Sequence, residues 1–262
     1  MDKSFLCSKK YPKENKSLIK NLCISCKQDS NIVIKDTEYC NQCFTSVQLK
    51  KYRKNLDIIE KDHKVLFCLS QSLISYVMLF FIFKCFRLKD KIFILVSTDC
   101  DKKILDLIEK FQLNIIKDNF IINSNYEEYR TNMINFASDN NFDILLLDEN
   151  IHMLVTFVLT GFCTNQIQNL NERIQNTETY KNLYILKPFS NFIDKEILYC
   201  YFLFKEIVSF KIYNFKFEPL FLKCYDFVYH LSLRNYSTPF NVINTLKKAF
   251  LEIKEEELNI KL

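Results

Sequence analysis

From about residue 64, the chain alternates between short apolar runs and longer segments whose apolar residues recur at helical spacing. Strands are predicted at residues 65–70, 91–97, 113–118 and 142–148, and helices at residues 72–86, 100–111, 126–140 and 151–161. Strands that are apolar on both faces and separated by helices are typical of a parallel sheet covered on both sides. We therefore expect an α/β domain whose ligand sites lie beyond the carboxyl ends of its strands.

Polar side chains follow several of these predicted strands. Asp99, Asp148 and Glu149 stand where a ligand would bind, but a carboxylate before a helix more often caps that helix, and we expect capping here. His152 has no partner at the spacing of a metal site or a catalytic triad. We expect it to have a core or surface role.

The remaining chain predicts two further parts. Residues 162–182 are polar and rich in Asn and Gln, which predicts a loop. From residue 183 onward the pattern is mainly helical. We therefore divide the chain into an N-terminal module at residues 1–63, an α/β domain at 64–182 and a helical region at 183–262.

The N-terminal module contains two C-x-x-C pairs separated by 13 residues. These pairs are Cys23 with Cys26 and Cys40 with Cys43. Two such turns can complete a tetrahedral zinc site, and the intervening NIVIKD and TEY segments read as short strands, so the layout predicts a zinc ribbon. Four thiolates leave no open position for water, which indicates a structural zinc. A redox-active C-x-x-C is the alternative, and two pairs at this spacing argue against it.

A basic segment follows the second pair. Its candidate residues for binding nucleic acid are Lys50, Lys51, Tyr52, Arg53 and Lys54. Residues 1–64 hold 14 basic and 8 acidic residues, a net charge of +6, whereas the rest holds 22 and 23, a net charge of −1. Such a concentration of positive charge suits a polyanion: Lys and Arg would meet phosphates, and Tyr could stack on an unpaired base. The alternative is an ordinary helix with a solvated basic face.

Composition bears on the cellular compartment. The longest apolar run, residues 73–83, is shorter than the roughly 20 residues that span a bilayer, and the chain opens on a polar segment rather than a signal sequence. Eleven cysteines in such a chain favour reduced thiols and metal binding. We expect a cytoplasmic protein without a membrane partner.

The turn after the first predicted strand is rich in serine. Ser70, Gln71, Ser72 and Ser75 lie between an apolar strand and an apolar helix, a place where many α/β proteins bind phosphate. Such turns need glycine for positive φ and for close approach of the backbone to phosphate. The whole chain has a single glycine, and it is not in this turn. Without glycine, the turn could be a phosphate site, the remains of one, or an ordinary turn in an apolar domain.

The order of zinc ribbon, basic helix, strand, serine turn and helix resembles that of the cytoplasmic tRNA 2-thiolation proteins, in the PP-loop ATPase superfamily. Their usual turn, S-G-G-x-D-S, is matched here by its first and last serines, while both glycines and the aspartate are replaced. Two later stretches, KPFSNFIDKEILYC and STPFNVINTLKKAF, also resemble family segments. The matching residues there are Lys187, Pro188, Phe192, Lys195, Glu196, Ile197, Tyr199, Pro239, Val242, Thr245 and Leu246.

The resemblance implies a PP-loop fold, similar to the adenine nucleotide alpha hydrolases, and a role in 2-thiolation of wobble uridine 34 in tRNA. The degenerate turn and the absence of any C-x-x-C after Cys43 imply the non-catalytic subunit. Its implied partners are the catalytic paralogue, tRNA and, indirectly, a ubiquitin-like sulfur carrier. Two alternatives stay open: an active ATP-dependent tRNA sulfurtransferase, and a zinc-ribbon nucleic-acid module unrelated to thiolation.

Overall fold

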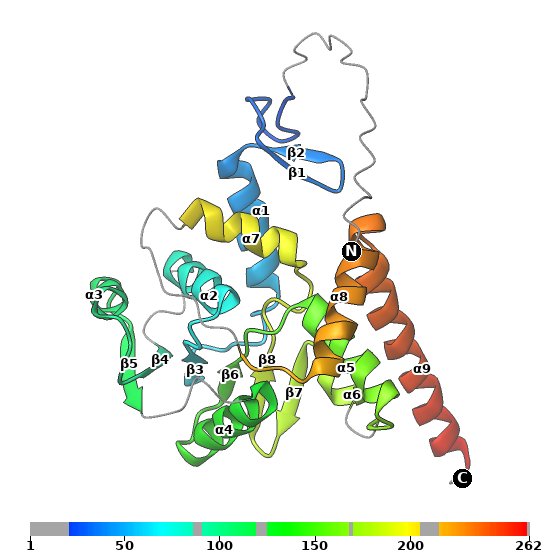
Figure 1. Cartoon of the computed structure of the whole chain (residues 1–262). Coiled ribbons are helices and arrows are strands. Elements are labelled where there is room, and N and C mark those ends of the chain that lie inside the picture. The colour runs from blue at the N-terminus through cyan, green and yellow to red at the C-terminus, as the bar shows by residue number, and fades with distance from the viewer. Residues whose placement is uncertain (1–20, 86–90, 119–124, 168–169, 205–214, 261–262) are drawn as a thin grey trace, which may run out of the picture. The chain divides into compact units, whose positions relative to one another are not determined.

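The computed structural model describes residues 21–85, 91–118, 125–167, 170–204 and 215–260 (Figure 1). The polar opening of the chain, on which the expected compartment partly rests, lies outside these residues. Contacts between Cα atoms divide the chain into two compact units, Met1–Phe44 and Thr45–Leu262, and each is described by itself. No helix within the described ranges is both long and apolar enough to cross a membrane.

The first unit is built around an antiparallel hairpin of β1 (Ile32–Ile34) and β2 (Thr37–Tyr39). Lys35 and Asp36 form its two-residue turn with positive φ angles of 49° and 59°, as a type I′ hairpin requires. The side chains of Ile32 and Ile34 are buried and that of Val33 is exposed, the alternation of a strand with one covered face. The two strands lie between the cysteine pairs, where the spacing predicts them.

The second unit contains a six-stranded sheet in the order β5-β4-β3-β6-β8-β7 (Figure 1). Its strands are β3 (Val65–Cys68), β4 (Ile92–Ser97), β5 (Asn114–Asp118), β6 (Ile144–Leu146), β7 (Thr177–Tyr180) and β8 (Leu183–Leu186). Every neighbouring pair is parallel except β7 with β8. The predicted α/β architecture with a mainly parallel sheet is confirmed.

Strands β7 and β8 depart from the prediction. β7 lies in the segment predicted as a loop, and β8 lies where mainly helical structure is predicted. In β8 the side chains of Leu183, Ile185 and Leu186 are buried, but an apolar run this short does not distinguish a strand from a buried helix. β8 pairs with β6, so the sheet continues beyond residue 182.

Helices alternate with the strands. They are α1 (Asn41–Lys54), which begins in the first unit, α2 (Leu73–Lys84), α3 (Lys102–Lys110), α4 (Tyr126–Asp139), α5 (Ile151–Cys163), α6 (Leu170–Arg173), α7 (Asp194–Phe204), α8 (Pro219–Arg234) and α9 (Thr238–Ile260).

Short polar side chains begin four of these helices. Ser72, Asp101, Asn125 and Asn150 each accept a hydrogen bond from a backbone N–H of the first turn of α2, α3, α4 and α5, respectively. The prediction that Asp99, Asp148 and Glu149 are caps is therefore wrong. Asp101 has that role in α3 and Asn150 has it in α5, which leaves the three predicted acids for other contacts.

Two apolar clusters hold the second unit together. In the first, Leu66 and Leu145 of the sheet pack with Met133 of α4 and Phe157 of α5. In the second, other residues of α5 pack against α8 and α9. Residues of α5 pack in both clusters, and this packing fixes the start of the helix. The segment between β6 and α5 is therefore held in place at the carboxyl end of the sheet.

Candidate functional site

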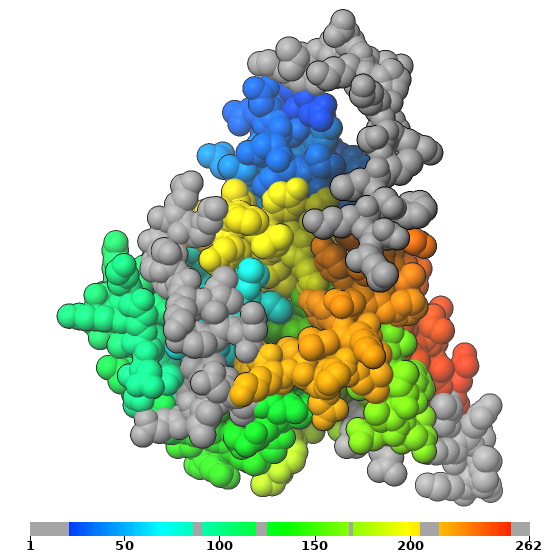
Figure 2. All heavy atoms as spheres, viewed as in Figure 1, coloured from blue at the N-terminus to red at the C-terminus, as the bar shows by residue number. Residues whose placement is uncertain are grey.

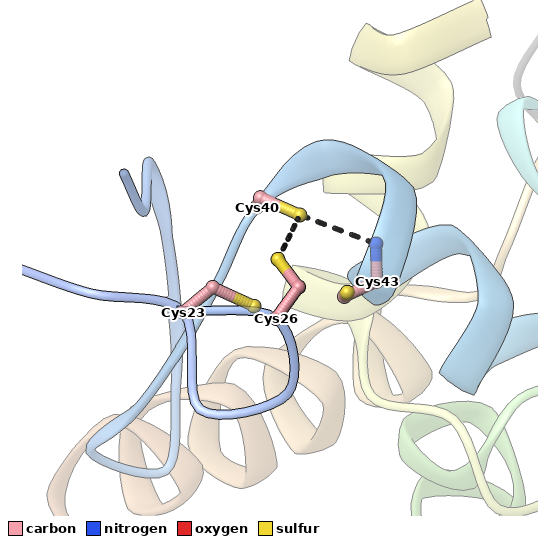
Figure 3. A group of neighbouring side chains, drawn as sticks. All are labelled: Cys23, Cys26, Cys40 and Cys43. Atoms are coloured by element: carbon pink, nitrogen blue, oxygen red, sulfur yellow. Dashed lines mark hydrogen bonds between the residues drawn. The ribbon is translucent and has the colours of Figure 1, made fainter. Parts of the chain in front are cut away.

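The first unit brings the four predicted cysteines together as a cysteine cluster of Cys23, Cys26, Cys40 and Cys43 (Figure 3). Their sulfur atoms all lie within 4.8 Å of one another. The first pair belongs to a tight turn in which the N–H of Lys27, with a φ of 61°, donates to the Cys23 carbonyl. Cys40 directly precedes α1 and Cys43 lies in its first turn.

The thiols of this cluster are disposed to act as metal ligands. The Sγ atoms of Cys26 and Cys40 are 3.6 Å apart, and the N–H of Cys43 donates to Cys40 Sγ at 3.5 Å. Desolvation opposes ionisation of Cys23, but hydrogen bonds from the backbone of Cys26, Cys40 and Ser25 outweigh it and lower the pKa of this thiol to about 6. A set of four thiolates fits either tetrahedral zinc or an iron–sulfur cluster.

Within the described residues, no other group of three or more His, Cys, Asp or Glu side chains brings its ligand atoms so close. The described cysteines of the second unit do not form such a group, and several of them are buried. Burial raises the pKa of Cys100 to about 11, and it raises the pKa of Cys85 as well.

The basic segment of α1 is divided between surface and core. Lys50, Arg53 and Lys54 are exposed, and Arg53 also donates a hydrogen bond to the Lys84 carbonyl at 3.2 Å. Lys51 instead pairs with Glu196 of α7, with its Nζ 2.7 Å from a carboxylate oxygen. Three of the five predicted residues are therefore exposed, whereas Lys51 is held in an ion pair and Tyr52 is buried.

Tyr52 is fully buried. Its ring packs edge-on against Phe81, with centroids 5.2 Å apart, and at 5.4 Å against Phe189. No face of the ring is left on which a base could stack. The expectation that Tyr52 binds RNA is corrected here: Tyr52 attaches α1 to the core of the second unit.

The serine turn, residues 70–75, lies at the carboxyl end of β3. We call it closed because its serine hydroxyls are hydrogen-bonded to Asp148, which lies just after the neighbouring strand β6. The hydroxyl groups of Ser70 and Ser72 both donate to the same oxygen of Asp148, at 2.8 and 2.7 Å. Ser72 Oγ also accepts the N–H of Ser75 at 3.0 Å. Asp148 is 3 % exposed, and its burial raises the pKa of the carboxyl, which the two serine hydrogen bonds partly offset.

The backbone of the turn retains one property of a glycine loop. Gln71 has a φ of 59° and a buried side chain, so a residue with a Cβ adopts the left-handed conformation that glycine adopts at little cost. Ser75 is fully buried, and its hydroxyl donates to the Ser72 carbonyl at 2.9 Å. The chain itself thus supplies acceptors to the hydroxyls of all three serines.

A buried charge network, which the sequence does not reveal, begins at Glu149. Its carboxylate accepts hydrogen bonds from the Tyr126 hydroxyl at 2.9 Å and from Arg130 Nε at 3.3 Å. Arg173 and Lys187 also approach it, at 3.6 and 3.9 Å. Burial opposes ionisation of Glu149, but Arg130, Arg173 and Lys187 outweigh it and lower the pKa of this carboxyl.

A second buried group centres on Asp194, at the start of α7. It accepts hydrogen bonds from the Tyr225 hydroxyl, at 2.7 Å, and from the Asn150 side chain, and it lies 2.9 Å from Nδ1 of His152. His152 is 1 % exposed, so of the two expected roles, core and surface, it has the core one. These contacts connect the start of α5 to α7 and α8, so we assign them a structural role.

Comparison with known proteins supplies evidence at the level of fold. No protein-family model matches the chain, and no curated protein matches its sequence. Among solved structures it is similar to the U34-tRNA thiolase NcsA from Methanococcus maripaludis with its [4Fe-4S] cluster, with a TM-score of 0.69 and 16 % identity over 88 % of this chain and 87 % of that one. A weaker likeness, with a TM-score of 0.40 and 13 % identity over 79 % of this chain and 93 % of that chain, is to an NH3-dependent NAD synthetase from Campylobacter jejuni. The likeness to the thiolase shows that the two chains share a fold.

Proposed function

We propose that this protein is a non-catalytic subunit of a tRNA 2-thiolation complex and supports 2-thiolation of wobble uridine 34. The observation that carries the proposal is the serine turn closed by Asp148, in a chain that shares the fold of a U34-tRNA thiolase. The shared fold supports the connection with thiolation. The closed turn argues against nucleotide chemistry in this subunit.

The argument against nucleotide chemistry is both steric and electrostatic. A phosphate loop needs backbone N–H groups that close around phosphate and glycines that let the phosphate approach. Here Gln71 and Ser72 carry side chains at those places, and the serine hydroxyls donate to a buried carboxyl. A phosphate entering the turn would meet Asp148, whose ionised form repels it.

The remaining assignments follow from that role. The four cysteines would hold a structural zinc, which supplies folding energy to the first unit rather than a reaction centre. The exposed Lys50, Arg53 and Lys54 would contact tRNA phosphates. The partner would be a catalytic paralogue that receives sulfur from a ubiquitin-like carrier in the cytoplasm.

A reconstituted thiolation assay tests this function. We expect purified tRNA to gain 2-thiouridine when the catalytic paralogue is combined with this chain, and to gain little when the chain is omitted. Mass spectrometry of tRNA nucleosides gives the readout. Full thiolation without this chain would contradict the proposal and favour an unrelated nucleic-acid module. Thiolation by this chain without the paralogue would instead identify an enzyme.

A further inference from the structure

Helix α8 presents a broad outward face in the second unit. Its opposite side is held in place, because Phe221 and Val228 are buried in the two apolar clusters and the Tyr225 hydroxyl donates to Asp194. Figure 2 shows α8, in orange, on the visible face of the molecule. Since the buried side fixes the helix, the side chains of the outward face start from a defined position.

One side of this outward face is apolar. Leu222, Tyr229 and Leu233, which we call the apolar stripe, are spaced by seven and four residues and therefore lie along one side of the helix. They are 49 %, 39 % and 63 % exposed. The Tyr229 ring also lies near the His152 ring, with centroids 6.2 Å apart, which restrains its orientation. Large apolar side chains exposed next to one another are typical of a surface that another protein covers.

A basic edge runs beside the apolar stripe. It consists of Lys223, His230 and Arg234, each of which directly follows a residue of the stripe, and all three are exposed. Neither Lys223 nor Arg234 forms an ion pair with another residue of the described ranges. The single acid between positions 222 and 234 is Asp226. Two formal positive charges against one negative charge favour a partner with an acidic surface.

The pattern of charge and apolar surface discriminates among classes of partner. In an antiparallel two-fold pair of α8 helices the same edges would meet, so the cations Lys223 and Arg234 of the two copies would repel one another. RNA would be attracted to the basic edge, but Leu222 and Leu233 offer it neither a hydrogen-bond donor nor a ring for stacking. The face is complementary to an amphipathic helix that has an apolar stripe and an acidic edge.

We propose that the outward face of α8, formed by the apolar stripe and the basic edge, is the docking surface for the catalytic paralogue, which would present an amphipathic helix with an acidic edge. The inference rests on the proposed function, because that function supplies the partner. The apolar stripe would form the buried centre of the interface, with Tyr229 as its aromatic anchor. The basic edge would form part of the rim and speed association.

Calorimetric titration of the purified full-length chain with the purified catalytic paralogue tests the apolar stripe. Leu233→Asp should weaken binding about tenfold or more, because it places a carboxylate against an apolar partner surface. Leu251→Asp is the matched control. Leu251 lies in α9 and is 61 % exposed, and this variant should bind as the unmodified chain does.

A charge reversal tests the basic edge. The double variant Lys223→Glu/Arg234→Glu should slow association with the paralogue about tenfold at low salt and less at high salt, where charges are screened. Biolayer interferometry measures the rates. The control is Lys102→Glu/Lys103→Glu, which reverses two exposed lysines of α3 and should leave the rates unchanged. Thermal unfolding checks that each variant is folded.

Several results would overturn the proposal. Equal binding of the paralogue to the unmodified chain and to folded Leu233→Asp would reject this surface and leave the proposed function intact. A paralogue that binds neither chain would contradict the proposed complex as well.

Two further measurements address the other occupants. Sedimentation velocity would assign the face to a second copy if the chain self-associates and Leu233→Asp abolishes this without changing paralogue binding. A tRNA titration would assign it to RNA if Lys223→Glu/Arg234→Glu lowers tRNA affinity while paralogue binding is unchanged. Either result would replace the paralogue as the occupant of this surface.

Discussion

The cysteine cluster and the serine turn both gather polar groups in one small volume, and they differ in what completes them. The four sulfurs of the cluster lie within 4.8 Å of one another. The serine hydroxyls of the turn meet a carboxyl from the same chain, Asp148. Four thiol ligands of the same kind would be completed by a bound metal ion, whereas the serine donors of the turn already have an acceptor in the same chain.

The largest effect is expected when the cluster can no longer bind the proposed zinc. Replacing Cys40 by Ser should abolish stoichiometric metal binding and unfold the first unit, because structural zinc contributes on the order of 10 kcal/mol to the folding of such small modules. Metal analysis and NMR spectra report the two losses. Cys163→Ser, an exposed cysteine outside the cluster, is the control and should change neither. A Cys40→Ser chain whose first unit is folded but binds no metal would show that this unit does not depend on a metal ion for its stability.

A smaller effect is expected when the turn loses its acceptor. Asp148→Ala removes the acceptor of the buried Ser70 hydroxyl and of the half-buried Ser72 hydroxyl, and we expect the free energy of unfolding to fall by about 2–4 kcal/mol. Urea unfolding measures the change, and Asp106→Ala, on the exposed face of α3, is the control. An unchanged unfolding midpoint would mean that the carboxyl does not close the turn.

A pH series sharpens the role of the Asp148 charge. Burial raises the pKa of Asp148 above its ordinary 3.8, so folding favours the protonated acid. Its contribution to stability is therefore greatest below pH 3.8 and is lost as pH rises through the folded pKa. Asp148→Asn keeps an acceptor without the charge, so the unmodified chain should lose stability relative to this variant across that window. A constant difference between pH 4 and 8 would contradict the raised pKa.

The smallest effect concerns the basic face of α1. Changing Lys50 and Lys54 to Glu should weaken tRNA binding several-fold and lower its salt dependence, since each removes a possible phosphate contact. Stability should hardly change, because both side chains are exposed. Lys51→Ala provides the contrast: it breaks a partly buried pair with Glu196, so it should lower stability by about 1 kcal/mol. Unchanged tRNA affinity of the double variant would reject this surface.

Local spacing and contacts across the fold explain which features the sequence could predict. The cysteine cluster depends on two short turns, and each of the four strands predicted between residues 65 and 148 contains a short apolar run, so both features can be recognised from local sequence. Strand β7 (TETY) has no apolar run, and the short apolar run of β8 (LYIL) does not distinguish a strand from a buried helix. The position of Tyr52 among lysines predicts a contact with RNA, but a helix has two faces and this residue lies on the buried one.

The buried networks were beyond the sequence for a different reason. Asp148 accepts hydrogen bonds from serines 76 and 78 residues earlier, and the partners of Glu149 come from α4, from α6 and from Lys187, directly after β8. Such pairings depend on strand order, which brings β3, β6 and β8 together in the sheet. The one local signal is an acidic pair after an apolar strand, and that pattern predicts helix caps rather than a buried network.

The central claim is that the closed turn performs no nucleotide chemistry, and ATP–pyrophosphate exchange by the purified chain tests it most directly. We predict no exchange above background, with or without tRNA, and no change on replacing Ser70 by Ala. Exchange that is measurable in the unmodified chain and abolished by Ser70→Ala would contradict the account and identify this chain as an active enzyme.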